Sequence, residues 1–110
     1  MRLYLSGKIT GHDNYKEYFA AGRAKLENAG YEVCDPTTFD FPGDIHWAEA
    51  MKYDIREMLQ CDGVALLPNW KESKGALIEA RLAKSLGIIT KPLSGWLKGD
   101  GMRPPGPSGS

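Results

Sequence analysis

Residues 63–79 read GVALLPNWKESKGALIE, and they decide the fold class. The first part of this stretch, 63–67, is a continuous apolar run, which is typical of a strand covered on both faces. Ser73 follows a short loop and is a capping residue for a helix that ends at Gly87. A buried strand that leads directly into a helix is the repeating unit of α/β proteins with a parallel sheet.

The same alternation of strands and helices extends to both sides of this stretch. Strands are predicted at 2–6 (RLYLS), at 31–34 (YEVC) and from Ile88 to Thr90, before Pro92. Helices are predicted from Asn14, which has Glu17 at the capping-box spacing, to Gly30, and from Asp44 to about Gln60. Right-handed crossovers then give a three-layer, flavodoxin-like or Rossmann-like α/β domain with a parallel sheet in the order 2-1-3-4. The sheet has four strands, or five if residues 92–96 add another.

The helices are predicted to pack through apolar residues at helical spacing. These residues are Tyr15, Tyr18, Phe19, Gly22 and Leu26 in the first helix, Trp47, Met51, Ile55 and Met58 in the second, and Ile78, Leu82 and Leu86 in the third. One domain is expected over residues 1–98. Residues 99–110 are mostly Gly, Pro and Ser, and we interpret them as a disordered tail or a remnant of the expression vector.

Composition and charge restrict the classes of function. The 110 residues provide for one domain, in which 14 basic residues balance 14 acidic ones. A net charge of zero attracts neither nucleic acid nor an anionic membrane, so neither is expected as a partner. No apolar run approaches the roughly 18 residues of a membrane span, and no secretory signal precedes the first strand. Cys34 and Cys61 are interpreted as buried reduced thiols, and the expected location is cytoplasmic.

Neither a metal nor another cofactor is expected. His12 and His46 have no metal-ligand spacing to each other or to the cysteines. No serine, histidine and acid combination has the arrangement that an acyl-transfer triad needs.

Three loops are expected to form a ligand site, because open parallel sheets bind ligands beyond the carboxyl ends of their strands. They are residues 6–11 (SGKITG), 39–47 and 68–75. In the first loop, two glycines that bracket Lys8 and Thr10 allow backbone amides to approach an anion. The alternative is that the glycines serve only a tight turn between strand and helix.

Asp54 is a candidate functional acid because it interrupts an apolar helix face, between Met51 and Met58. A buried carboxyl group needs either a partner or a cavity, so the alternative is that backbone amides of a neighbouring loop satisfy it. Asp62 is interpreted as a turn residue between helix and strand, in preference to a residue of the ligand site. Trp70, in the loop after the third strand, either stacks on a base or packs against the domain.

Glu79 is a second candidate, because small residues lie one helical turn before and after it. Gly75 and Ala83 leave volume above its carboxylate that a ligand can occupy. The alternative is an exposed glutamate beside Arg81 or Lys84.

The run YLSGKITG at residues 4–11, together with Asp54, Asp62, Ser73, Gly75 and Glu79, resembles the nucleoside 2-deoxyribosyltransferase superfamily. More narrowly, it resembles the short uncharacterised proteins of that superfamily in phages and bacteria. The resemblance covers residues 1 to about 90. Its most specific parts are the step from Asp54 to Asp62 and the run from Ser73 through Gly75 to Glu79.

The resemblance implies an N-glycosidase or deoxyribosyltransferase. Glu79 would attack the anomeric carbon, Asp54 would protonate the leaving base, and Tyr4 would orient the nucleophile. Ser73 resembles the serine of the 2′-deoxynucleoside 5′-monophosphate N-hydrolases, whereas transferases of free nucleosides carry an acid there. Lys8 and Thr10 depart from the hydrolase pattern, which has a serine and an arginine. The substrate-binding residues would be Gly7, Lys8, Ile9, Thr10, Gly11, Asp62, Trp70, Ser73, Lys74 and Gly75.

The resemblance and the number of large apolar side chains, Trp47, Met51, Met58, Trp70 and Trp96 among them, also predict a homodimer or larger assembly. The expected partner is otherwise a small nucleotide or nucleoside. The alternative function is a non-catalytic nucleotide-binding sensor or adaptor.

Overall fold

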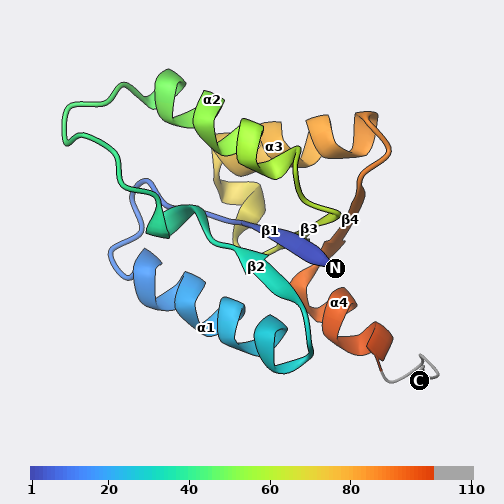
Figure 1. Ribbon diagram of the computed structural model, residues 1–110. Coiled ribbons are helices and arrows are strands. Elements are labelled where there is room, and N and C mark those ends of the chain that lie inside the picture. Colours follow the sequence, from blue (N-terminus) through green and yellow to red (C-terminus); the bar gives the residue numbers. More distant parts are fainter. Residues whose placement is uncertain (101–110) are drawn as a thin grey trace.

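The computed structural model describes residues 1–100. In chain order the elements are β1 (Arg2–Ser6), α1 (Tyr15–Asn28), β2 (Glu32–Cys34), η1 (Pro36–Thr38), α2 (Trp47–Met58), β3 (Gly63–Leu66), η2 (Trp70–Glu72), α3 (Lys74–Ser85), β4 (Ile89–Pro92) and α4 (Leu93–Asp100). The four strands are parallel and lie in the order β2-β1-β3-β4, which confirms the predicted topology. Helices α1 and α4 cover one face of the sheet, and α2 and α3 cover the other (Figure 1).

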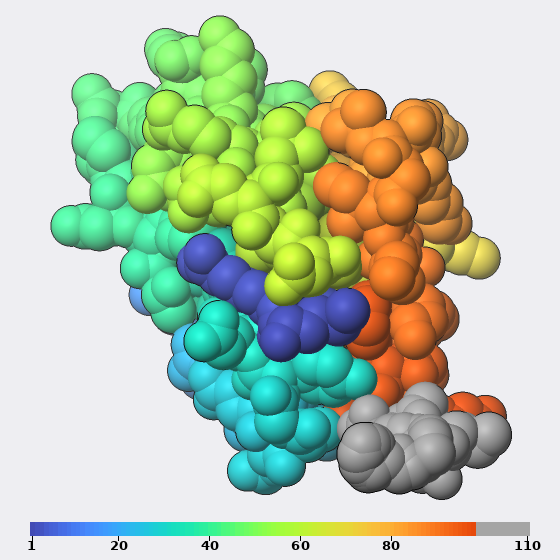
Figure 2. All heavy atoms as spheres, turned by 45° about the vertical axis from the view of Figure 1, so that its right-hand side comes forward, coloured from blue at the N-terminus to red at the C-terminus, as the bar shows by residue number. Residues whose placement is uncertain are grey.

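The alternation of side chains along β1 supplies two separate cores. Leu3 and Leu5 point to the face under α1 and α4, where they pack with Phe19, Leu26 and Trp96. Tyr4 points to the opposite face, where it packs with Val64, Met58 and the two cysteines. Both cysteines are free and buried, as predicted. In Figure 2, α2 (green) and α3 (orange) adjoin on one side of the molecule, above the N-terminal strand (blue).

The predicted fifth strand is wrong, because residues 93–100 form a helix. Trp96 determines this packing: its indole N–H donates to the carbonyl of Val64 at 2.9 Å. The ring lies so close to Gly63 that a Cβ there would be 2.7 Å from it. The helix extends beyond residue 98, where the domain was predicted to end, and the rest of the predicted tail lies outside the described residues. Among residues 1–100, no helix combines the length and apolar character that crossing a bilayer requires.

Two predicted helix caps differ from the structure. Asp44 does not cap α2, since the helix begins at Trp47 with His46 in the capping position. Asn14 occupies the predicted cap position of α1, but its side chain makes no capping hydrogen bond, so the capping box is absent. The cap at Ser73 is confirmed, because its Oγ accepts a hydrogen bond from the amide of Ala76 at 3.1 Å.

The faces on which α2 and α3 pack also differ from the prediction. Trp47 is 45% exposed rather than inward, and Ile55 is only partly buried. On α3 the buried residues are Ala76, Glu79, Ala80 and Ala83, while Ile78 and Leu86 are exposed. The reason is steric: alanines allow α3 to lie close to the sheet, whereas a row of leucine and isoleucine side chains would hold it further away.

Candidate functional site

A cavity of about 740 Å³ opens at the carboxyl edge of the sheet, where the predicted loops converge. It is bounded by the loops after β1 and β2, by α2 and by the first turn of α3. The predicted site residues that line it are Tyr4, Gly7, Ile9, Thr10, Asp54, Ser73, Lys74, Gly75 and Glu79. Within the described residues, four predicted site residues do not line it: Lys8, Gly11, Asp62 and Trp70.

Glu79 lies at the wall of this cavity and is 5% exposed. The Tyr4 hydroxyl donates to its Oε2 at 2.8 Å, and the Ser6 hydroxyl donates to its Oε1 at 2.7 Å. The pKa of Glu79 is raised to about 7: burial is the main cause and the charge of Asp54 adds to it, while the hydrogen bonds from Ser6 and Tyr4 oppose the rise. The carboxylate is therefore held in one orientation and remains protonatable near neutral pH.

Asp54 projects from α2 into the same cavity, between apolar neighbours. Its Oδ1 is buried and has no hydrogen-bond partner among the described residues. Burial raises the pKa of this carboxyl group to about 6. A buried carboxyl oxygen without a partner is costly, and at a cavity wall it is available to a ligand.

Tyr4 and Ser6 reach Glu79 from the same face of β1, two residues apart. Burial raises the pKa of Tyr4 well above its ordinary value, and the nearby charges of Glu79 and Asp54 act in the same direction. Its hydroxyl therefore stays protonated and donates. Ser6 is the nearest functional residue that the sequence analysis did not select, and the alternation of β1 was the signal that could have found it.

The first turn of α3 forms a second part of the site. Ser73, Lys74 and Gly75 line the cavity, and the first amides of a helix have no partner inside it. Gly75 brings this turn close to α2, since a Cβ on it would lie 3.0 Å from the Met51 sulfur. The Lys74 ammonium lies 4.7 Å from the centre of the Trp47 ring, which also lines the cavity.

Lys8 is already occupied by the loop that follows β3. Its backbone amide donates to Asn69 Oδ1 at 3.1 Å, and its ammonium lies 3.4 Å from Glu72 Oε1. Glu72 lines the cavity, whereas Lys8 does not. Gly7 brings the two loops together, since a Cβ on it would lie 2.8 Å from Leu67.

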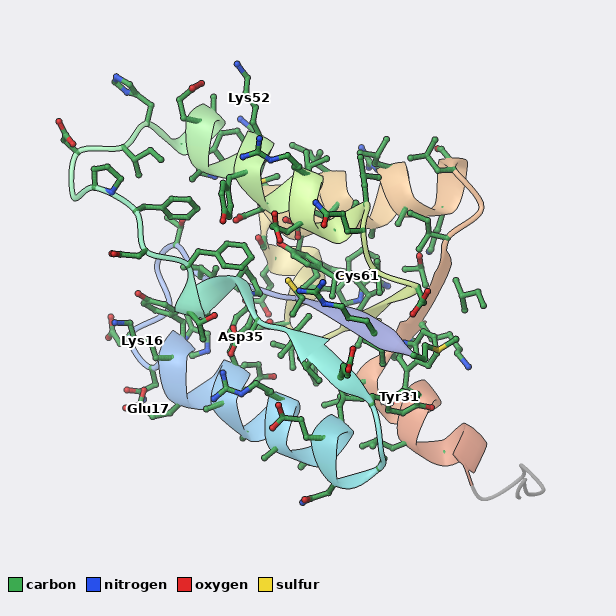
Figure 3. All side chains as sticks on the ribbon, in the orientation of Figure 1. Lys16, Glu17, Tyr31, Asp35, Lys52 and Cys61 are labelled. Carbon is green, nitrogen blue, oxygen red and sulfur yellow. The ribbon has the colours of Figure 1, made fainter. Side chains whose placement is uncertain are left out.

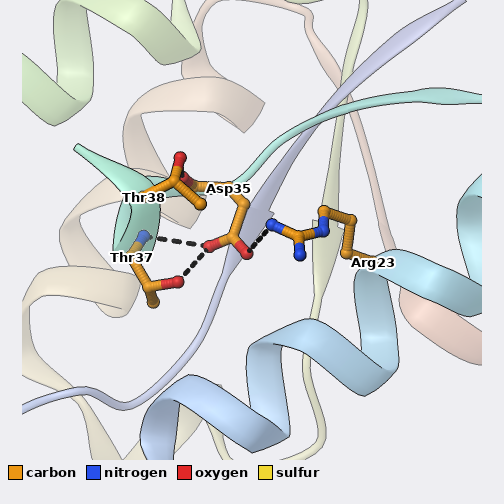
Figure 4. Close-up of polar contacts among 4 residues, drawn as sticks. All are labelled: Arg23, Asp35, Thr37 and Thr38. Atoms are coloured by element: carbon orange, nitrogen blue, oxygen red, sulfur yellow. Dashed lines mark hydrogen bonds and ion pairs between the residues drawn. The ribbon is translucent and has the colours of Figure 1, made fainter.

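The wall that follows β2 was expected only as a loop. Asp35 is buried and anchors it: its carboxylate accepts from the Thr37 amide at 2.9 Å, the Thr37 hydroxyl at 2.7 Å and the Arg23 guanidinium at 2.9 Å (Figure 4). Beyond η1, Phe39 and Phe41 line the cavity and pack edge to face with each other. An acid directly after a strand, two residues before a threonine, was the available signal for this anchor.

Asp62 and Trp70 have structural positions. Asp62 lies at the amino end of β3, where its carboxylate accepts from the Arg2 amide at 2.8 Å. Trp70 packs against the core that contains Tyr4, and the ammonium groups of Lys71 and Lys84 lie 5.8 Å and 5.7 Å from its ring centre. Within residues 1–100, no three His, Cys, Asp or Glu side chains are grouped so that they could hold a metal ion.

Solved structures of two enzymes share this fold. The 2-deoxyribosyltransferase of Bacillus psychrosaccharolyticus matches with a TM-score of 0.64 and 15% sequence identity over 82% of this chain and 69% of that one. The 2-desoxiribosyltransferase of Leishmania mexicana matches with a TM-score of 0.62 and 20% identity over 83% of this chain, which spans 62% of that protein's length. The domain thus has a 2-deoxyribosyltransferase-like fold.

No curated protein sequence matches the chain. A family model matches residues 1–91, which is most of the domain. The chain belongs to the family described as Domain of unknown function (DUF4406).

Proposed function

We propose that this protein cleaves the N-glycosidic bond of a 2′-deoxynucleoside or its 5′-monophosphate, by hydrolysis or by transfer of the deoxyribose to another base. The observation that carries the proposal is the pair of carboxyl groups in one cavity. Glu79 is buried and held by two hydroxyl donors, whereas Asp54 has an oxygen without a partner among the described residues. The likeness to two 2-deoxyribosyltransferases supports the same class of chemistry.

In the first step, a Glu79 carboxylate oxygen forms a bond to C1′ of the deoxyribose as the C1′–N bond breaks. The bonding electron pair goes to the base, and the Asp54 carboxyl group donates its proton there. The neutral base leaves, Asp54 becomes a carboxylate, and the sugar remains as an ester on Glu79. Splitting the displacement into two steps through a held carboxylate is the usual route of retaining glycosidases.

In the second step, the Asp54 carboxylate takes a proton from water, or from the N–H of an incoming base. The freed oxygen or nitrogen forms a bond to C1′ while the bond to Glu79 breaks. This step restores an ionised Glu79 and a protonated Asp54. Tyr4 and Ser6 hold the Glu79 oxygens throughout, which limits the reorganisation that the reaction requires.

Two further parts of the cavity support a nucleoside-sized ligand. Phe39, Phe41 and Trp47 offer ring surface on which a base can stack. The first turn of α3, with Ser73, presents amides toward the 5′ end of a sugar whose C1′ lies against Glu79. The similarity of Ser73 to the serine of monophosphate N-hydrolases belongs to this proposal.

The test is release of free base from a panel of deoxynucleosides, ribonucleosides and their 5′-monophosphates, followed by chromatography. Asp54→Asn should lower the rate by about 10²- to 10⁴-fold, and Glu79→Gln by at least as much, since the covalent route disappears. Glu49→Gln is the matched control, because Glu49 is exposed, pairs with Lys52 at 3.3 Å and lies outside the cavity. Figure 3 shows Lys52 pointing away from the domain.

A 2-fluoro-sugar nucleoside analogue identifies the nucleophile, because it slows breakdown of the ester. Mass spectrometry should find the glycosyl adduct on Glu79. An adduct on another residue, or normal turnover by Glu79→Gln, would refute the assignment. Saturable binding with no base released from any compound would instead favour the non-catalytic sensor or adaptor.

The proposal includes a homodimer. Ile78 on the outer face of α3 and Leu86 at its C-cap are 37% and 57% exposed, and Leu59 at the end of α2 is 47% exposed. Apolar side chains of this size on adjoining helices are suited to a contact between two copies of the chain.

A further inference from the structure

We propose that Glu72 is a specificity-determining residue that disfavours a 5′-phosphate, so that the site discriminates between a free nucleoside and its monophosphate. The inference rests on the proposed function, since it assumes that the sugar lies with C1′ against Glu79. It is carried by the contacts of Lys8 and Glu72 at the rim of the cavity.

Both groups of Lys8 that could bind an anion are engaged by the opposite loop. The amide donates to Asn69, and the ammonium pairs with Glu72. The Glu72 side chain is 67% exposed and lines the cavity, while that of Lys8 is 29% exposed and lies outside the lining. A ligand therefore meets the carboxylate of this pair before it meets the ammonium.

The formal charges around the cavity also disfavour a phosphate. Among its lining residues, the acidic side chains are Asp54, Glu72 and Glu79, and the basic one is Lys74. A neutral nucleoside adds no charge to this set, whereas a phosphate monoester adds between one and two negative charges near neutral pH. The site is thus better matched to the nucleoside than the residue types of the first loop alone would indicate.

The position of Glu72 places its effect at the 5′ end of the sugar. Gly75 and Glu79 are one helical turn apart, a rise of about 6 Å along α3, so a sugar that reacts at Glu79 extends toward the first turn. Glu72 directly precedes the cap of that turn. A phosphate there must either lie beside the Glu72 carboxylate or replace it at Lys8.

The experiment compares binding of each 2′-deoxynucleoside and its 5′-monophosphate by calorimetry, in a Glu79→Gln background so that no ligand is consumed. Adding Glu72→Gln should strengthen monophosphate binding by about 1.4- to fivefold, the range for exposed charges, and leave nucleoside binding unchanged. The gain should shrink in 1 M salt, where the screening length is about 3 Å. Glu49→Gln is the control: it removes the same charge from an exposed ion pair outside the cavity. It should leave the affinity for the nucleoside and for the monophosphate unchanged.

Lys8→Met provides the second arm. It should weaken monophosphate binding strongly only when combined with Glu72→Gln, because Glu72 otherwise holds the ammonium; such non-additivity is the signature of a direct pair. If monophosphate and nucleoside affinities change by the same factor in Glu72→Gln, the role of Glu72 is refuted while the proposed function stands. If no nucleoside or monophosphate binds, both are refuted.

Discussion

Glu79 and Asp54 lie in one cavity, and burial raises their pKa values to about 7 and about 6. The proposed first step needs Glu79 ionised and Asp54 protonated, which is one of the two forms of the singly protonated pair. Because the pKa of Glu79 is the higher of the two, the other form, with the proton on Glu79, predominates, and the reaction proceeds through the minor form. Because the two groups interact, the apparent pKa values belong to the pair rather than to either residue.

We therefore expect a narrow bell-shaped profile of kcat/KM against pH, with its maximum midway between these values, at about 6.5. Activity should fall about tenfold per pH unit outside the limbs. In Asp54→Asn the residual rate should lose the alkaline limb and rise to a plateau, since only the ionisation of Glu79 then matters. A wild-type profile that is flat from pH 5 to 8 would contradict the proposed roles.

The raised pKa of Glu79 also makes stability depend on pH. Its pKa is about 7 in the fold against an ordinary value of 4.5, so between these values the folded state binds more protons than the unfolded state. The free energy of unfolding must then fall as pH rises through this window, by about 3 kcal/mol if the whole shift is expressed.

Urea unfolding at pH 5 and pH 8 measures this effect. The wild type should lose stability between the two, and Glu79→Gln should lose less, because glutamine does not ionise; the loss that remains is the part due to Asp54, whose pKa is also raised. Equal losses in the two proteins would show that Glu79 is not the group responsible.

Asp54 and Glu79 could be selected from the sequence as candidates for the site, whereas the groups around them could not, and their chemical roles stay predictions. Asp54 and Glu79 are recognisable because a carboxyl group on an apolar helix face, or beside small residues, is unusual. Ser6 and Asp35 are not, because a serine at the end of a strand and an aspartate after one have many structural roles. Only the folded chain shows that Ser6 holds Glu79 and that Asp35 anchors η1.

Among the elements, α3 combines a capped first turn with the helix face that carries Glu79. The Ser73 side chain caps this helix, and aspartate caps about equally well. Ser73→Asp should therefore leave the melting temperature almost unchanged. It should weaken binding of a deoxynucleoside 5′-monophosphate by like-charge repulsion and spare the deoxynucleoside.

Calorimetry with both ligands and a thermal melt test this expectation. Ser73→Ala is the control for the cap itself, and its loss should cost about 1 kcal/mol of stability. An equal loss of affinity for both ligands in Ser73→Asp would mean that no phosphate binds at this turn.

The packing faces of the helices were harder to predict than their existence. Ile78 on α3 and Leu86 at its C-cap are large apolar residues that are exposed, yet the helix buries Ala80 and Ala83. Hydrophobicity alone could not distinguish a close-packed small face from an exposed large one. A fifth strand at residues 92–96 is an alternative that the sequence leaves open, although the spacing from Leu93 to Trp96 and Leu97 fits one face of a helix.

For the whole molecule, the sheet order was predictable because each strand is separated from the next by a helix, which favours parallel strands with right-handed crossovers. The oligomeric state is a property that has to be measured in solution. We expect light scattering at tens of micromolar to give a dimer or larger species.

Substitution on the outer face of α3 locates the contact. Leu86→Glu should shift the protein toward monomer, because an exposed apolar side chain becomes charged. Lys16→Glu is the control, since Lys16 lies on α1, on the other side of the sheet (Figure 3). A monomeric wild type would exclude the assembly.

The reactivity of the two buried thiols, Cys34 and Cys61, reports local unfolding around the cavity. Hydrogen bonding with Cys34 and burial raise the pKa of the Cys61 thiol, so its reactive thiolate is scarce while the fold is closed. Cys34 directly precedes the Asp35 anchor, and Cys61 follows α2, so both flank segments that wall the cavity. A molecule that fills the cavity should slow the reaction of both thiols with Ellman's reagent, since labelling requires these segments to separate. Ligands can therefore be sought by the kinetics of thiol labelling, before any reaction product is known.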